Sequence, residues 1–343
     1  MELKTGRKSS FECRGEVAVA GFQGSTGAGG EKRLHPFFVN GRINKGVITM
    51  ILAFDTLDEI YALFPGGKFD FSRWEQYADR WFGGDSHLFR DDMEEAIGSG
   101  NYSYERDYLP VIQGVYQNIK LLQVRRFFFN VTERLDEKVK DNFGEKLDAD
   151  IVLYLGLCNG AGWAVSLNGR EKVLLGIEKI LELGWTGLMD LQGLVYHELG
   201  HLYHIQHGFF HQAPQEGPRR FVWQLFAEGI AMCFEQVLVG DWEFYQQDKG
   251  GWRAWCRKNH TEILQNFDRD LPVMSRGNQL YFGDWVSYKG HGDTGYFLGA
   301  KWVQSLLLHH SFQEVIQLPL ESVCKFYKDY VEEVLGVESN LQF

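Results

Sequence analysis

The sequence lacks the patterns that would point to a nucleic-acid or membrane protein. Lys and Arg form no basic stripe, and the formal net charge of the 343-residue chain is −11. Because phosphate binding needs concentrated positive charge, we expect no nucleic-acid partner. The first residues, MELKTGRKSSFECRGE, hold no apolar stretch of the secretory type. No apolar run approaches the roughly 18 residues that span a bilayer, so we expect no membrane partner.

Cysteine is scarce and widely spaced. The chain has five cysteines, none of them in a CxxC pair: Cys13, Cys158, Cys233, Cys256 and Cys324. A disulfide framework or a thiolate zinc site is therefore not expected. Reduced thiols in a cytoplasmic protein fit this pattern.

Hydrophobic residues make up 44% of the chain and aromatic residues 15%. This is enough apolar material for one large domain or two closely joined lobes. Residues 1–48 read as an N-terminal extension. Its Gly-rich stretch GFQGSTGAGG (Gly21 to Gly30) lacks the GK[ST] ending of a phosphate loop, so a surface loop is expected.

Hydrophobic periodicity divides the rest of the chain into two regions. Residues 49–148 read as a mainly helical N-terminal region, introduced by the apolar strand VITMILAF (Val47 to Phe54). Residues 149–180 contain strand-like runs, and a helical pattern follows them. Further helices are expected near 219–239, 252–267, 293–310 and 312–335. This order predicts an α+β fold in residues 149–343: a small mixed sheet with a histidine-rich helix to about residue 211, then a mainly helical lobe.

The stretch LVYHELGHLYHIQHGFFHQ (Leu194 to Gln212) holds five of the eleven histidines. It contains an H-E-x-x-H motif, His197 to His201. Four residues of helix advance about 6 Å and about 400°, so both imidazoles leave one face and can reach one zinc ion. Glu198 is rotated about 100° from His197, where it can act on a bound water instead of ligating. A helix with coincidental histidines is the plainer alternative.

A third ligand is expected from RRFVWQLFAEGIAMCFEQVLVG (Arg219 to Gly240), a helix that is apolar almost all round. An ionised Glu228 in this helix would be costly to bury unless a cation or an Arg pairs with it. Gly229 and Ala231 are small and should let this helix approach the histidine helix closely. Glu235 shares the face of Glu228 and is a weaker candidate.

The other histidines give a competing ligand set. His207 stands six residues after His201, as the third ligand does in the metzincin pattern H-E-x-x-H-x-x-G-x-x-H. That pattern needs a Gly where this chain has His204, because the chain must leave the helix there. His204 is expected in a supporting position or at the rim of a cleft, and His207 and His211 at the surface or in supporting positions.

HELGH followed by AEGIA (Ala227 to Ala231) resembles the gluzincin zinc peptidases. The similarity is greatest to a family of predicted bacterial zinc-dependent proteases of poorly known function. LGIEKI (Leu175 to Ile180) and GYFLG (Gly295 to Gly299) stand where that family has similar segments, so the resemblance covers roughly residues 150–310. It implies a zincin-like fold, one Zn²⁺ ion held by His197, His201 and Glu228, and a peptide or protein substrate.

The resemblance also implies a mechanism. Glu198 would act as general base on a water polarised by zinc, and a Tyr or His well after the ligand Glu would stabilise the oxyanion. Tyr296 is the favoured residue for that role and His291 the second, with Tyr288 nearby. Apart from the resemblance, the extended segment CNGAGWAVSLNG (Cys158 to Gly169) could pair with a substrate peptide as an added strand, and a simple hairpin turn is the alternative.

One position departs from the family pattern. Thermolysin-like enzymes place an Asp four residues after the ligand Glu, where this chain has Met232. The residue that orients a ligating histidine must then come from elsewhere, with Asp190 and Glu235 as candidates. Two other functions stay open: a zinc hydrolase of a non-peptide amide, and a metal-stabilised binding protein without turnover. The sequence leaves the oligomeric state open.

Overall fold

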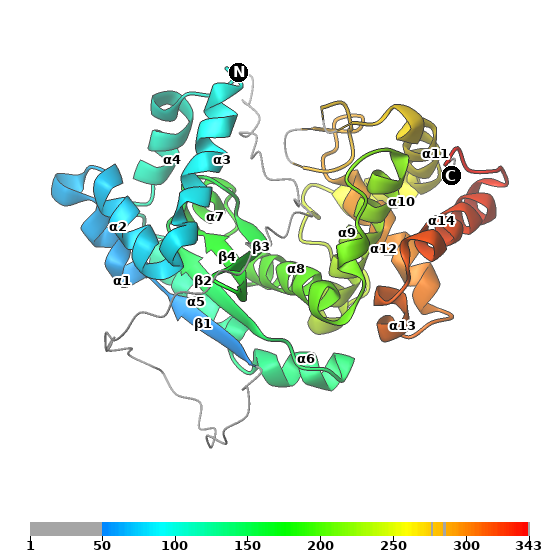
Figure 1. The fold of residues 1–343 in the computed structure, drawn as a ribbon, viewed down its shortest axis with the longest axis horizontal. Helices are drawn as coiled ribbons and strands as arrows, with labels where there is room; N and C mark the ends of the chain where they lie inside the picture. The colour runs from blue at the N-terminus through cyan, green and yellow to red at the C-terminus, as the bar shows by residue number, and fades with distance from the viewer. Residues whose placement is uncertain (1–49, 276, 284–285, 342–343) are drawn as a thin grey trace.

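The computed structural model describes residues 50–275, 277–283 and 286–341. The predicted extension, residues 1–48, lies outside them. The described chain has a mixed α/β fold with a four-stranded sheet and many helices, which confirms the predicted class at this level. Figure 1 shows the sheet among the N-terminal helices, a long helix extending from it, and the later helices grouped beyond that helix.

The sheet has the strand order β1-β2-β4-β3. β1 (Ile51–Asp55), β2 (Ala149–Tyr154) and β4 (Arg170–Gly176) run parallel, and β3 (Gly162–Leu167) runs antiparallel to β4 at the edge. β2 is buried along its whole length, as expected of an inner parallel strand that is covered on both faces. The pairing of β1 with β2 joins the two regions across the predicted boundary at residue 148.

The segment between β1 and β2 is mainly helical. Its α-helices are α1 (Leu57–Ile60), α2 (Phe71–Phe82), α3 (His87–Gly98), α4 (Leu109–Gln113), α5 (Leu121–Thr132) and α6 (Leu135–Phe143). Aromatic side chains join these helices to the sheet: Phe89 contacts Tyr154 and Trp163 with ring centroids 5.5 Å apart in each pair. Such contacts hold the N-terminal helices on the same core as the strands.

Three long helices cross closely after the sheet: α8 (Leu188–His207), α9 (Pro218–Val239) and α12 (Thr294–Leu307). A Cβ on Gly200 of α8 would lie 2.8 Å from the Cα of Ala231 on α9. A Cβ on Gly229 of α9 would clash with the carbonyl of Gly299 on α12. Ala231 therefore faces α8 as predicted, whereas the prediction for Gly229 is wrong, because Gly229 serves the contact with α12.

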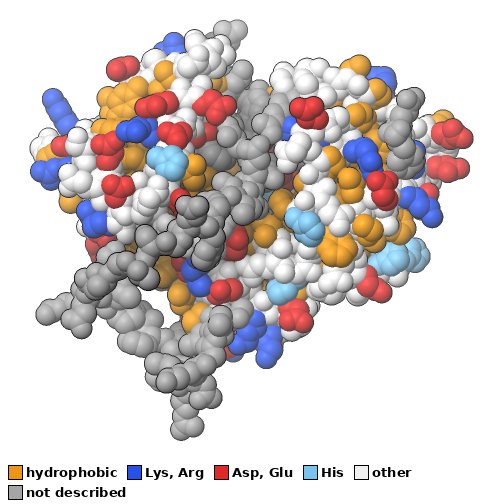
Figure 2. Space-filling view, in the orientation of Figure 1, with side chains coloured by type: hydrophobic (Ala, Val, Ile, Leu, Met, Phe, Trp, Pro, Cys, Tyr) orange, Lys and Arg blue, Asp and Glu red, His pale blue; other side chains and the backbone are white. Residues whose placement is uncertain are grey.

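The remaining helices are α7 (Ile177–Glu182), α10 (Trp252–Lys258), α11 (His260–Asp270), α13 (Phe312–Ile316) and α14 (Leu320–Leu335). α9 is long and apolar enough to cross a membrane by length and composition, but most of it is buried inside the fold. Figure 2 shows Lys and Arg side chains interspersed with Asp and Glu over the described part of the visible face.

Candidate metal centre

His197, His201 and Glu228 converge between α8 and α9. The Nε2 atom of His197 lies 3.2 Å from Oε2 of Glu228, and the Nε2 atom of His201 lies 3.4 Å from the same oxygen. One ligand atom from each of the three residues falls within 4.8 Å of the other two. The structure therefore brings together the three residues predicted as ligands.

Local helix geometry and one close contact create this convergence. α8 is unbroken from Leu188 to His207, so the two histidines project one turn apart from the same face. Glu228 lies three residues before Ala231 on α9, on the side that touches Gly200 of α8. The small residues at this crossing let the α9 carboxylate reach both imidazoles.

The cluster lies in the interior. Glu228 is 1% exposed, His201 3% and His197 8%. Burial alone would raise the pKa of Glu228, but the charge of His201 and hydrogen bonds from both imidazoles hold that pKa well below its usual range. Burial likewise opposes a charged His197, yet hydrogen bonds to Glu228 and Glu235 raise its pKa to about 10.

This environment fits a divalent cation. An isolated buried carboxylate is costly, and here two imidazoles with raised pKa values stabilise it. A metal ion would supply the same positive charge while leaving both imidazoles neutral. Two imidazole nitrogens and one carboxylate oxygen are the donor set of catalytic zinc sites that keep a further position open.

Glu198 lies beside the ligand set and not within it. Its carboxylate is buried, and burial raises its pKa, against the lowering effect of His201 and His197. It accepts a hydrogen bond from the backbone N–H of Ala164 on β3. A Cβ on Gly162 would lie 3.1 Å from Cγ of Glu198, so the edge strand packs directly against this residue. The sequence places Glu198 on the helix but does not reveal this contact.

Glu235 lies on the other side of His197 from Glu228. Its Oε2 atom lies 3.5 Å from Nδ1 of His197, the ring nitrogen opposite the one that faces Glu228. Burial raises the pKa of Glu235 to about 7, although His197 opposes the shift. Of the two predicted orienting residues, Glu235 is the one that contacts His197, whereas the carboxylate of Asp190 accepts the backbone N–H of Gly187 at the start of α8.

Tyr296 is the predicted oxyanion residue that contacts the cluster. It is the third residue of α12, and its ring centroid lies 5.5 Å from that of His197. Asp293 occupies the N-cap position of α12 without a side-chain capping bond. His291 stacks on Trp255 with ring centroids 3.8 Å apart, so its ring lies against α10. Tyr288 accepts a hydrogen bond from the side-chain amide of Asn266, 2.6 Å away.

The other histidines of α8 have different surroundings. His204 is fully buried against the rings of Phe210, Trp223 and Phe226, and burial lowers its pKa to about 3. Of the two predicted places for His204, burial excludes the cleft rim and leaves the supporting position. α8 continues without a break to His207, whose Nε2 atom lies 2.8 Å from the carbonyl oxygen of Lys146. His207 is thus directed away from His197, His201 and Glu228, against the metzincin alternative.

Glu178, in the LGIEKI segment, fixes the loop between β2 and β3. Its buried carboxylate accepts the backbone N–H groups of Gly156 at 2.9 Å and Cys158 at 3.1 Å. Burial raises the pKa of Glu178 to about 7, and these hydrogen bonds oppose the shift. The loop that it holds leads into β3, so Glu178 helps to position the strand that contacts Glu198.

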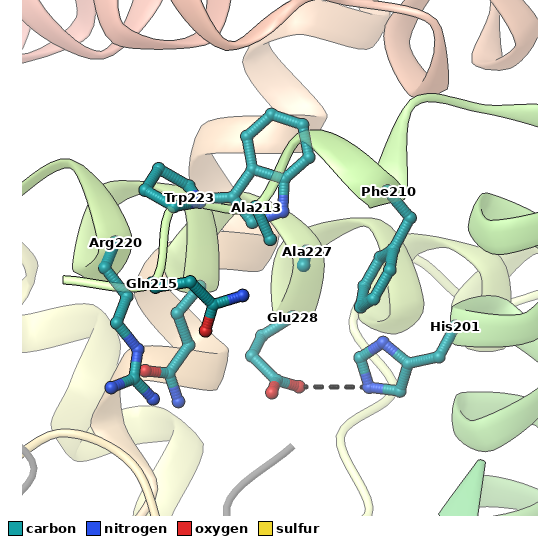
Figure 3. Close-up of a pocket in the computed structure, with 10 residues that line it drawn as sticks. His201, Phe210, Ala213, Gln215, Arg220, Trp223, Ala227 and Glu228 are labelled. Atoms are coloured by element: carbon teal, nitrogen blue, oxygen red, sulfur yellow. Dashed lines mark ion pairs between the residues drawn. The ribbon is translucent and has the colours of Figure 1, made fainter. Parts of the chain in front are cut away.

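A cavity opens beside the cluster. His201 and Glu228 line one part of it, and Arg220, Gln215 and Gln224 line another. Figure 3 shows Arg220 and Gln215 on one side of Glu228 and His201 on the other. Sequence reasoning missed this cavity. The available signal is the spacing of Arg220, Gln224 and Glu228, which occupy positions i, i+4 and i+8 of one helix.

Comparison of the chain with protein-family models, with curated proteins and with solved structures gives no match. The case for a function therefore depends on the side chains of the site.

Proposed function

We propose that the chain is a zinc-dependent peptidase of the gluzincin type with a zincin-like fold. The observation that carries the proposal is the convergence of His197 and His201 of the H-E-x-x-H motif with Glu228 of the next long helix. Glu198 stands next to this set without belonging to it, as a general base must.

His197, His201 and Glu228 would hold the ion. A zinc ion in such a site acts as a Lewis acid and brings the pKa of bound water to about 7. The Glu198 carboxylate would accept a proton from the attacking water and pass it to the nitrogen of the leaving amine. The hydrogen bond from Ala164 keeps this carboxylate in place beside β3. Tyr296, against His197, donates its hydroxyl proton in a hydrogen bond to the developing oxyanion.

β3 is the segment suited to hold an extended peptide. It is the outer strand of the described sheet next to β4. The N–H of Ala164 reaches Glu198, so the side of β3 away from β4 faces the proposed general base. A peptide that adds to this edge by backbone hydrogen bonds would bring its carbonyl groups to the reacting centre. Backbone pairing of this kind favours a peptide over a small non-peptide amide.

Zinc removal tests the proposal directly. Protein stripped by a chelator should lose hydrolysis of a mixed peptide library, and one equivalent of zinc should restore it, because the water needs a Lewis acid. Mass spectrometry of the library measures cleavage, and elemental analysis measures zinc per chain. Unchanged cleavage by the metal-free protein contradicts the proposal. A zinc-dependent melting temperature without any cleavage would instead identify a metal-stabilised binding protein.

The Tyr296→Phe variant should lower kcat by about 10²- to 10³-fold, the cost of removing one oxyanion donor. Its zinc content and KM should change little, because the ring that contacts His197 and Phe282 remains. Steady-state kinetics on one cleaved peptide measures the effect. Tyr288→Phe is the matched control, since the Tyr288 hydroxyl is bonded to Asn266 instead. Equal kcat in the two variants would remove Tyr296 from the mechanism.

A further inference from the structure

We propose that the cavity beside the metal centre is a specificity pocket that binds the side-chain amide of a substrate Gln or Asn. This inference rests on the proposed peptidase function and names the substrate class: peptides with a neutral amide side chain near the cleaved bond. The groups that would recognise this amide are the indole N–H of Trp223 and the side-chain amides of Gln215 and Gln224, which all line the cavity.

The first support is the indole N–H of Trp223. The residue is 3% exposed, and its Nε1 atom has no hydrogen-bond partner among the described residues. By contrast, the indoles of Trp74, Trp163 and Trp252 each donate to an oxygen atom 2.8 to 3.1 Å away. A buried donor without a partner is destabilising. An acceptor on a molecule bound in the cavity would remove that cost.

The ring of Trp223 is held in a fixed position. It stacks on the ring of His204 with centroids 6.0 Å apart, and its centroid lies 5.7 Å from that of Phe226. In Figure 3 the indole nitrogen lies on the edge of the ring that is nearer to Gln215 and Glu228. A donor that is already oriented loses little conformational freedom when a ligand binds, so more of its hydrogen bond contributes to affinity.

The second support is the pair of glutamine amides. Neither Gln215 nor Gln224 forms a side-chain hydrogen bond with any residue that the structure describes. Gln212, by comparison, accepts the backbone N–H of Leu320 at 3.0 Å. Each glutamine amide offers two N–H donors and one carbonyl acceptor. With the N–H of Trp223, these neutral groups match a ligand that both accepts and donates hydrogen bonds, as an amide does, better than a carboxylate, which only accepts.

The third support is the position of the cavity. Its described lining comes from α8, α9 and the segment between them, whereas the substrate backbone is proposed to pair with β3. The group that enters the cavity should therefore be a side chain. Gln224 precedes Glu228 by about 6 Å along α9. Since a substrate residue spans roughly 3.5 Å in an extended chain, the bound amide belongs to a residue within one or two positions of the cleaved bond.

Apolar side chains complete the pocket. Phe210, Ala213 and Ala227 line the cavity together with the face of Trp223. The methylene groups of a substrate Gln would contact these side chains. Apolar walls also exclude water, and a hydrogen bond is stronger in such surroundings. The pocket therefore combines an apolar surface with a few polar groups that fix orientation, as ligand sites commonly do.

Trp302 provides an internal comparison. It is fully buried on α12, and its Nε1 atom also has no hydrogen-bond partner among the described residues. Trp302 is not one of the described residues that line the cavity. An unpaired indole N–H is thus not sufficient for a binding site, and the cavity is what distinguishes Trp223. Replacement of Trp302 by Phe is the control for the loss of a buried indole from the core.

The test uses zinc-loaded wild type, Trp223→Phe, Gln224→Leu and Trp302→Phe with peptides that carry Gln, Asn, Met, Leu or Glu at each position near one cleaved bond. Met has the length of Gln without its amide. Wild type should cleave the Gln or Asn peptide with a kcat/KM about tenfold above that of the Met peptide at one position. Trp223→Phe and Gln224→Leu should each lower this ratio at least about threefold, and Trp302→Phe should keep it. Melting temperatures verify folding, and Gln224→Leu decides if Trp223→Phe does not fold.

A binding measurement separates failure of the pocket from failure of the peptidase. Calorimetry on zinc-loaded Glu198→Gln protein compares a Gln-rich peptide pool with the same pool carrying Met or Glu in place of Gln. A preference for Gln that disappears on adding Trp223→Phe or Gln224→Leu supports the pocket even if wild type cleaves nothing. Cleavage with the same Gln preference in wild type and both variants overturns the pocket and leaves the peptidase standing. A preference for Met, Leu or Glu over Gln and Asn, or none at all, also overturns it.

Discussion

Zinc-loaded Glu198→Gln protein should hydrolyse peptides about 10²- to 10⁴-fold more slowly than wild type while it keeps one zinc ion per chain. The substitution removes the proton acceptor and changes little else. Glutamine has the same shape as glutamate, and its side-chain oxygen can still accept the N–H of Ala164. Glu198 is outside the group of three ligand residues, so the metal should remain.

Two measurements on the same preparation are needed to interpret this result. Elemental analysis measures the zinc content, and kcat/KM on a peptide cleaved by wild type measures the loss of activity. Glu182→Gln on α7 is a control for the chemical change alone, because Glu182 pairs with Lys179 away from the cluster. Activity within about twofold of wild type in Glu198→Gln would contradict the assignment of a general base, which should contribute far more.

The helix that carries the motif could be predicted because its geometry is local. His197 and His201 are one turn apart in any α-helix. Once the hydrophobic period predicts a helix here, it follows that the two imidazoles point to the same side. Glu228 could be predicted as a ligand for a different reason. A carboxylate in a helix that is apolar almost all round must meet a charge, and the neighbouring helix offers two imidazoles. In both cases a short-range rule or a large energetic penalty leaves few alternatives.

Contacts between distant segments could not be predicted in the same way. β1 pairs with β2 although α1 to α6 separate them, and the sequence of neither strand specifies this partner. Gly229 and Ala231 looked equivalent as small residues, but they face different helices. Which helix each residue faces depends on where α8 and α12 lie around α9. The hydrophobic period of α9 alone does not predict those positions.

The surroundings of His204 could not be predicted for a similar reason. Helical spacing puts His204 near the ligands and left open whether it supports them or lies at the rim of a cleft. The structure surrounds it instead with Phe210, Trp223 and Phe226, contributed by segments outside α8. These rings remove water from His204 and keep its imidazole neutral over the usual pH range. Phe210 and Trp223 also line the cavity beside the cluster, which was missed because its lining comes from α8, α9 and the segment between them.

Glu228→Ala should lower the zinc affinity by more than about a hundredfold, because loss of a group that merely supports a ligand already costs 10- to 100-fold. The change removes the only negative charge among the three described ligand residues and leaves two imidazoles as donors. Competition with a chromophoric chelator measures the affinity. Zinc should also raise the melting temperature much less in the variant, since ligand-induced stabilisation follows the ratio of free zinc to its dissociation constant.

Glu235→Ala is the matched control for Glu228→Ala. Both residues are buried glutamates on α9, and both lie close to His197. Glu235 faces Nδ1 of His197 and should affect zinc only through the orientation and basicity of that ring, which predicts a loss of about 10- to 100-fold. The order of the two affinities decides the assignment. If Glu235→Ala loses zinc while Glu228→Ala retains it, the ligand carboxylate is Glu235. The zinc ion, with its open coordination position, would then lie on the other side of His197.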